Sequence, residues 1–220
     1  MLFKKSQVWN TLQVKEDRSL ANSDKMPYEI HITVNAESGI TIPEYKEHCK
    51  AIGVKPIVLA LQDKTGKKVM DDVMTSSKFY GNNGEAWDEM KRISSALKSS
   101  GYNVIREKIE GSWWHPKAPF RADGDTKMPE GCYFECHLNI LCTSERLEDL
   151  SAIAKSMECH LSQNAFKQFE DGSFTIMMTY RSYDKMYEDF EEYLDLIKNK
   201  LKTSNFKLEK ETVEFSIHDT

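Results

Sequence analysis

The chain has 220 residues, of which 40% are hydrophobic and 30% are charged, a balance that favours a folded protein over a disordered one. No apolar run approaches the roughly 20 residues of a membrane-spanning helix, and the first residues lack the apolar core of a signal peptide, so we expect a cytoplasmic protein with no membrane partner. The net charge of −5 argues against nonspecific binding to duplex DNA, which depends on a basic surface.

The five cysteines are odd in number, and no two of them form a CxxC pair. This usage predicts neither a disulfide framework nor a zinc ribbon. We expect free thiols that mostly pack as small apolar groups.

The first predicted strand follows a polar arm at residues 1–26, which we expect to dock through Trp9. The segment YEIHITV at 28–34 alternates apolar and polar residues, as a strand with one buried face does. Its polar face carries Glu29, His31 and Thr33. An acid, an imidazole and a hydroxyl in one row indicate either a polar sheet surface or a site.

The rest of the first unit alternates between segments with the apolar spacing of a helix and segments with the apolar spacing of a strand. A short amphipathic helix is predicted at 42–52, a strand at 55–62, a turn at DKTGKK and a further strand that ends near residue 81. GNNGEAW then starts a helix, whose apolar stripe is Ala86, Met90, Ile93 and Leu97. A last strand follows at 102–110.

This whole pattern recurs about 105 residues later. YEIHITV corresponds to FECHLNI at an offset of 106, which aligns Glu135 with Glu29 and His137 with His31. MTSSKFYG corresponds to MTYRSYDK at an offset of 104, and LEDLSAIAKSME repeats the short helix. The second long helix carries its acids early and its lysines late, with an apolar stripe at Phe190, Leu194, Ile197 and Leu201. Only the second strand of the repeat, near HLSQNAFKQF, is unclear.

The repeat predicts an α+β protein built by internal duplication of two ferredoxin-like (βαββαβ) units with antiparallel sheets. The first unit spans 27–111 and the second 132–220. A linker at 112–131, rich in Pro, Gly and Asp, interrupts both periodicities. Each sheet has helices on one face, so its other face remains open and polar.

The first and third strands of such a unit lie side by side. We therefore expect the polar row of the first strand beside Asp71, Thr75 and Ser77, and the row of its repeat beside Thr175, Thr179 and Arg181. Arg106, Lys108 and Lys210 add charge at the edge strands. If the two open faces meet, both imidazoles enter one cleft.

Paired imidazoles suggest proton transfer, because imidazole titrates near neutrality and a neighbouring carboxylate fixes its tautomer. His31 and His137 then act as base and acid on a phosphodiester, with Glu29 and Glu135 as orienting groups. The residues expected to contact phosphate are Thr33, Thr75, Thr179 and Arg181. The partner that this hypothesis predicts is a small phosphorylated ligand or nucleotide, and the sequence identifies no cofactor.

The segment IHITV resembles the His-x-Thr motif of the 2H phosphoesterase superfamily, whose bilobal members use two such motifs on cyclic and RNA-type phosphate esters. The resemblance implies catalytic roles for His31 and His137 and phosphate binding by Thr33. It covers only a few residues in each half, and the second copy, CHLNI, has Asn139 in place of the hydroxyl residue.

One further histidine follows the last strand of each unit, His115 after EGSWW and His218 after EFSI. We expect both of them to bind substrate. Trp113 and Trp114 either cover a ligand or anchor the linker on a core.

Two other functions remain open. Glu29 with His31 and Glu135 with His137 offer metal ligands from single strand faces. Tandem ferredoxin-like units also serve as non-catalytic modules that bind a ligand or a protein.

Overall fold

The computed structural model describes residues 25–36, 41–62, 68–124, 126–169 and 172–220. The first half of the chain runs strand, helix, strand, strand, helix, strand. Its elements are β1 (Met26–Val34), α2 (Ile42–Ala51), β2 (Lys55–Gln62), β3 (Lys68–Gly81), α3 (Asn83–Ser99) and β4 (Val104–Ser112).

The second half repeats this order of elements. They are β5 (Tyr133–Cys142), α4 (Leu147–Ser156), β6 (His160–Gln168), β7 (Phe174–Ser182), α5 (Tyr187–Thr203) and β8 (Lys207–Asp219). The segment that the sequence left unclear is therefore a strand, β6, which pairs with β7.

All eight described strands form one closed antiparallel sheet, in the order β1-β3-β2-β6-β7-β5-β8-β4. The first and third strands of each half pair as predicted, β1 with β3 and β5 with β7. The prediction of edge positions for the fourth strands is wrong, because β4 and β8 pair with each other. Together with the β2–β6 pair, this contact joins the halves into a single sheet.

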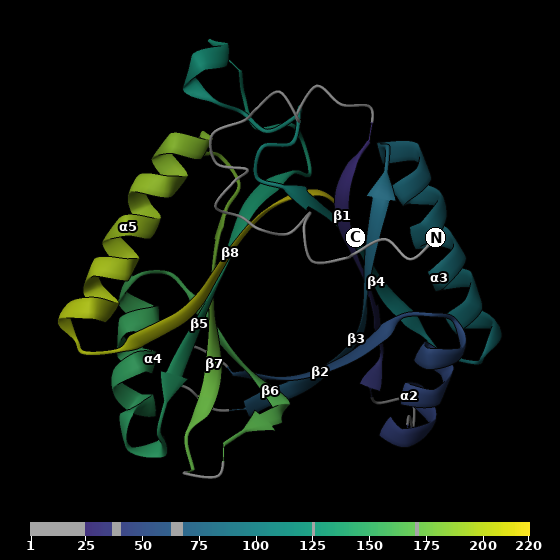
Figure 1. Cartoon of the computed structure of the whole chain (residues 1–220), viewed down its shortest axis with the longest axis horizontal. Helices are drawn as coiled ribbons and strands as arrows, with labels where there is room; N and C mark the ends of the chain where they lie inside the picture. The colour runs from purple at the N-terminus through teal and green to yellow at the C-terminus, as the bar shows by residue number, and fades with distance from the viewer. Residues whose placement is uncertain (1–24, 37–40, 63–67, 125, 170–171) are drawn as a thin grey trace.

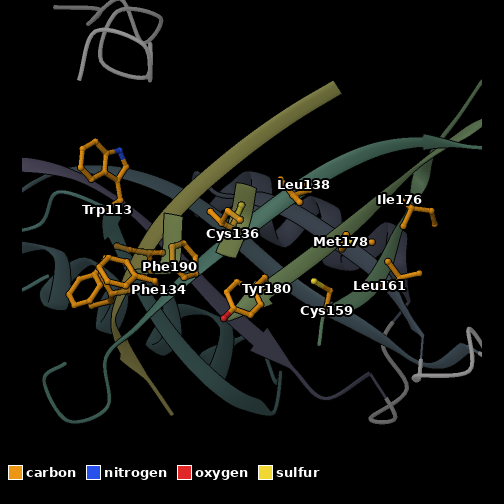
Figure 2. Close-up of a cluster of buried hydrophobic side chains, with 14 of the residues drawn as sticks. Trp113, Phe134, Cys136, Leu138, Cys159, Leu161, Ile176, Met178, Tyr180 and Phe190 are labelled. Atoms are coloured by element: carbon orange, nitrogen blue, oxygen red, sulfur yellow. The ribbon is translucent and has the colours of Figure 1, made fainter. Parts of the chain in front are cut away.

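The helices lie on the outside of this ring, α2 and α3 on one side and α4 and α5 on the other (Figure 1). Both predicted apolar stripes are buried against the strands, with Met90 and Phe190 at 0% exposure. Figure 2 shows part of this core, which includes Phe134 of β5 and Phe190 of α5. The centres of these two rings are 5.3 Å apart. The open, polar faces of the strands therefore point inward.

The segment between β4 and β5 is anchored on the core. Trp113 stacks on Tyr187 at 4.5 Å, and Trp114 is 4% exposed. The backbone N–H of Tyr187 also donates to Pro119 O. Of the two interpretations of these tryptophans, the structure confirms anchoring.

Several other expectations concern described residues. All five cysteines are free and buried, as predicted. No helix in the described part of the chain is long and apolar enough to cross a membrane. Most of the predicted arm with Trp9 and most of the DKTGKK turn lie outside the described residues. The division into two units and a linker stays a prediction.

Candidate active site

A cavity of about 510 Å³ lies inside the closed sheet and is lined by both His31 and His137. Its wall draws on both halves of the chain, because the inward faces of all eight strands contribute. Apolar groups line the β2–β6 side, among them Leu59 and Leu161. The charged residues along the wall are Glu29, Asp72, Arg106, Lys108, Glu110, Glu135, Arg181, Lys210 and Glu214.

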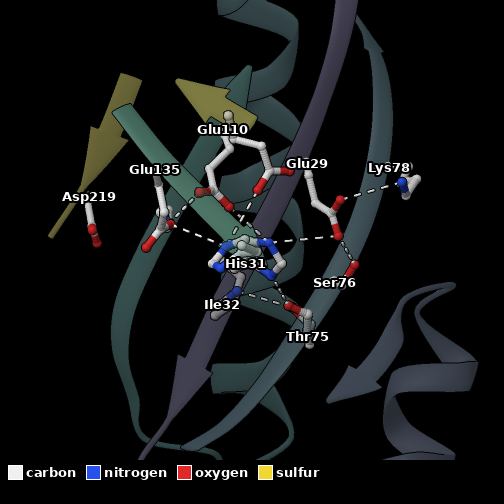
Figure 3. A network of polar contacts seen from close by, with 12 residues as sticks. Glu29, His31, Ile32, Thr75, Ser76, Lys78, Glu110, Glu135 and Asp219 are labelled. Atoms are coloured by element: carbon white, nitrogen blue, oxygen red, sulfur yellow. Dashed lines mark hydrogen bonds and ion pairs between the residues drawn. The ribbon is translucent and has the colours of Figure 1, made fainter. Parts of the chain in front are cut away.

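His31 is held between two acceptors. Its Nδ1 lies 3.0 Å from the carbonyl oxygen of Thr75, and its Nε2 lies 3.1 Å from Glu110 Oε2. Figure 3 shows the ring between Glu110 and Glu29, whose Oε1 is 3.8 Å from the same Nε2. A carbonyl oxygen and a carboxylate only accept hydrogen bonds, so both ring nitrogens carry a proton in this arrangement.

His137 has a different set of partners. Its Nδ1 lies 2.9 Å from Thr179 Oγ1, a hydroxyl that accepts from Nδ1–H in one tautomer of the neutral ring and donates to Nδ1 in the other. Its Nε2 lies 3.6 Å from Glu135 Oε2 and also 3.6 Å from Glu214 Oε2. These distances are longer than a hydrogen bond, so Glu135 acts on His137 through its charge and not through a hydrogen bond.

The pKa values of the two imidazoles are shifted in opposite directions. Burial disfavours a charged His31, but the hydrogen bond and charge of Glu110, with the charge of Glu29, raise its pKa above the ordinary value. Burial lowers the pKa of His137, and Glu135 offsets only part of this effect. The cavity thus favours a charged imidazolium in one half and a neutral imidazole in the other.

Glu214 differs from the other central carboxyls. Burial and the nearby charges of Glu110 and Glu29 raise the pKa of Glu214 well above its usual range. Glu110 behaves oppositely, because Lys108 and His31 outweigh its burial and hold its pKa well below the usual range. One of the two carboxyls therefore favours the protonated form while the other favours the carboxylate.

The neighbours of the first polar row differ from the prediction. Ser76 Oγ donates to Glu29 Oε1, Lys78 Nζ lies 3.5 Å from Glu29 Oε2, and Asp72 lines the cavity. The inward face of β3 thus carries the even-numbered residues, because Glu29 is opposite Lys78 in the register. The expectation of Thr75 and Ser77 on this face chose the wrong alternation, and the side chain of Asp71 lies outside the described part of the structure.

The neighbours of the second polar row agree with the prediction. Glu135 is opposite Arg181 and His137 is opposite Thr179, and both partners line the cavity together with Thr175. Arg181 Nε donates to Glu135 Oε1.

Four of the expected substrate-binding residues lie outside the cavity lining. Thr33 is buried opposite Met74. Thr75 is fully buried, and its Oγ1 accepts from the N–H of Ile32 at 3.2 Å. The other two are His115 and His218.

Both of these histidines pack in the structure away from the paired imidazoles. His115 is 1% exposed, and its Nε2 lies 3.1 Å from Asn83 Oδ1. Burial, with the charge of Lys117, lowers the pKa of His115 to about 4, so it is neutral. His218 lies within β8 rather than after it, and its ring packs on Trp87 at 4.8 Å.

Three central residues had no role in the predicted site: Lys108, which was expected only as a charge on an edge strand, Glu110 and Glu214. Glu110 is opposite Glu29 in the β1–β4 pair, and Glu214 is opposite Glu135 in the β5–β8 pair. The alternation of REKIE already places Lys108 and Glu110 on one face with Arg106. This signal was sufficient to include them.

Three side chains of the cavity wall are close enough to one another to hold a metal ion. Glu110, Glu135 and His137 offer ligand atoms that all lie within 4.8 Å of one another. The ammonium of Lys108, however, already contacts both of these carboxylates.

A comparison with models of protein families and another with curated proteins find no match to this chain. The likeness of IHITV to the 2H phosphoesterase motif therefore stays a prediction from the sequence.

Proposed function

We propose that the protein is a phosphodiesterase or related nucleotide-processing enzyme that uses His31 and His137 as a proton-transfer pair. The observation that carries this proposal is that both imidazoles line one cavity with their pKa values moved in opposite directions. Titratable pairs whose environments separate their pKa values mark the acid and the base of a site.

The roles follow from the protonation states. Neutral His137, in the tautomer whose Nδ1–H donates to Thr179, accepts a proton at Nε2 from the attacking water or hydroxyl as the oxygen of that group bonds to phosphorus. Charged His31 gives a proton to the leaving oxygen as the old P–O bond breaks, once that oxygen replaces Glu110 at Nε2. Thr179 orients His137, and Glu29 and Glu110 hold His31 in the charged form.

The cavity is suited to an anion because its carboxylates are largely compensated. Glu110 and Glu135 share Lys108, and Glu29 lies beside Lys78. Burial and neighbouring acids raise the pKa of Glu214, which reduces its negative charge.

Cationic and hydroxyl groups remain for the phosphate on the side of His137. Lys210 lines the cavity, and its side chain forms no hydrogen bond or ion pair with the described part of the chain. Arg181 and Thr179 line the same side, so the proposed phosphate contacts are these three residues. Thr33 and Thr75 leave the proposal, since they do not line the cavity.

We also propose that the chain arose by duplication of a ferredoxin-like unit. The same order of elements in both halves supports it, as does the order of strands, β4-β1-β3-β2 and β8-β5-β7-β6. The two Glu-x-His rows meet Glu110 and Glu214 in equivalent pairs. A cytoplasmic location and a small phosphorylated partner belong to the same proposal, and the free cysteines are compatible with it.

Turnover of a phosphodiester panel tests the enzyme against the alternative of a binding module. The panel contains 2′,3′-cyclic nucleotides, 3′,5′-cyclic nucleotides and dinucleotides. His31→Ala and His137→Ala should each lower kcat by about 100-fold or more while the fold is kept. His48→Ala is the matched control, because His48 is exposed and its Nδ1 pairs with Tyr102 outside the cavity.

Absence of turnover on every substrate would overturn the enzyme proposal. Affinity for a ligand that falls gradually over several cavity positions would instead identify a binding module.

A further inference from the structure

Lys108 lies at the centre of the cavity wall. It belongs to β4, directly opposite His31, and its side chain is 5% exposed. Its Nζ contacts Glu110 Oε1 and Glu135 Oε2, and it lies 5.4 Å from the centre of the Tyr133 ring. A lysine buried to this extent requires paired partners, and here both partners are carboxylates.

Each of these carboxylates also faces one imidazole. Glu110 Oε2 is 3.1 Å from His31, and Glu135 Oε2 is 3.6 Å from His137. Lys108 therefore joins the two halves of the site, because its partners come from β4 of the first half and β5 of the second. No other described lysine contacts both of these glutamates.

The same groups form the cluster that is able to hold a metal. Glu110, Glu135 and His137 provide two oxygens and a nitrogen within 4.8 Å of one another, a donor set that Zn²⁺ and Mn²⁺ accept. A divalent ion at this position would have to displace the Lys108 ammonium from two of the three ligands. The ammonium of Lys108 is a compact positive charge on a flexible four-carbon side chain, so it can lie between the carboxylates of Glu110 and Glu135.

We propose that Lys108 serves as the resident cation of this site, occupying with its ammonium the position that a divalent metal ion would take between Glu110 and Glu135, and thereby positioning both imidazoles. The inference does not depend on which reaction, if any, the cavity performs. It makes Lys108 a positioning residue, since it acts on the imidazoles through the two carboxylates.

Removal of the ammonium should therefore create a metal site. In Lys108→Ala, Glu110 and Glu135 lose the ammonium that they share, while Arg181 still contacts Glu135 and His31 still contacts Glu110. Zn²⁺ or Mn²⁺ alone should then bind between these carboxylates and His137. A metal that binds only the folded state should raise the thermal midpoint of the variant by roughly 5–10 °C at about 100 times its Kd. Lys210→Ala is the matched control, because Lys210 lines the same cavity without an ion pair to the described residues, and it should gain no such site.

The wild-type chain provides a measurement that does not depend on the stability of a variant. Ring ¹⁵N resonances of His31 and His137, assigned by mutation, are recorded as Zn²⁺ is added. We expect the His137 resonance to remain unchanged in the wild type and to move to a metal-bound position in Lys108→Ala.

Binding of Zn²⁺ at His137 in the wild-type chain would overturn the proposal, because Lys108 would then not hold the position. A folded Lys108→Ala protein that gains no metal affinity over the Lys210→Ala control would overturn it as well.

Discussion

Both imidazoles in the cavity have carboxyl groups nearby, but the polar atoms that touch each ring differ. His31 contacts a carbonyl and a carboxylate, whereas His137 contacts a hydroxyl and has its carboxyl neighbours at 3.6 Å. One close hydrogen bond to an ionised acceptor outweighs burial for His31, while longer-range charge does not do so for His137. Small differences in distance thus move the pKa values of two histidines in equivalent strands in opposite directions.

Glu110→Gln tests this account at the level of one residue. The neutral amide removes the charge that raises the pKa of His31, so that pKa should fall. Because Glu110 is also paired with Lys108 and is buried, folding should lose about 3–5 kcal/mol of stability. Histidine NMR titration and urea unfolding at pH 6 and pH 9, roughly on either side of neutrality, provide the two measurements.

The sign of the pH dependence follows from linkage. The folded pKa of His31 is raised, so its contribution to stability is complete below the unfolded value of about 6.5 and is lost as the pH rises through the folded pKa. The loss caused by Glu110→Gln should therefore be larger at pH 6 than at pH 9. Glu209→Gln, at an exposed position of β8, is the control. An unchanged His31 titration in Glu110→Gln would contradict the assignment of this acceptor.

At the scale of single elements, the long helices follow directly from local sequence. Asn82 caps α3, accepting from the N–H of Glu85 while the Glu85 side chain accepts from the N–H of Asn82. The stripe of α3 and that of α5 are buried as their spacing predicts. Helix position and orientation are thus fixed by nearby residues.

Asn82→Ala should remove this cap. The expected cost is about 1 kcal/mol, which lowers the thermal midpoint by about 2–4 °C for a chain of this size. Ser95→Ala, at an exposed position in the same helix, should leave the midpoint unchanged or slightly raised. Calorimetry of both variants measures the difference. Equal midpoints for the two would show that the capping box contributes nothing.

Strand faces were less predictable than helix faces. In β5 the alternation placed Glu135 and His137 beside Arg181 and Thr179, which the register confirms. In β3 both possible faces carry polar residues, since Asp71 and Asp72 are adjacent and Thr75, Ser76 and Ser77 follow one another. Without an apolar and a polar face to compare, the sequence offers no basis for choosing the inward side.

At the scale of the whole molecule, closure of the sheet determines the site. The pairs β4–β8 and β2–β6 turn the uncovered faces of both halves inward and bring His31 and His137 to one cavity. A strand with one polar face has the same alternation at an edge as inside a sheet, so these two long-range pairs have no local signal. Closure was therefore the part of the fold that periodicity did not predict.

A closed sheet should also unfold as one unit. Ile30 of β1 is fully buried, so Ile30→Ala should cost about 2–5 kcal/mol. The strand pairs β4–β8 and β2–β6 connect the two halves. The native NMR signals of β5 should therefore disappear at the same urea concentration as those of β1, in the variant and in the wild type. Exposed Ile105→Ala is the control. Persistence of β5 signals after those of β1 are lost would show that the halves are independent.

The most direct test of the proposed shared site is an NMR titration of His31 and His137 with single mononucleotides and cyclic nucleotides. If both imidazoles face one phosphate site, one such ligand should shift both ring signals with the same midpoint, and Lys210→Ala should weaken this binding. Independent titrations of the two rings that respond to none of the ligands would contradict a common phosphate site.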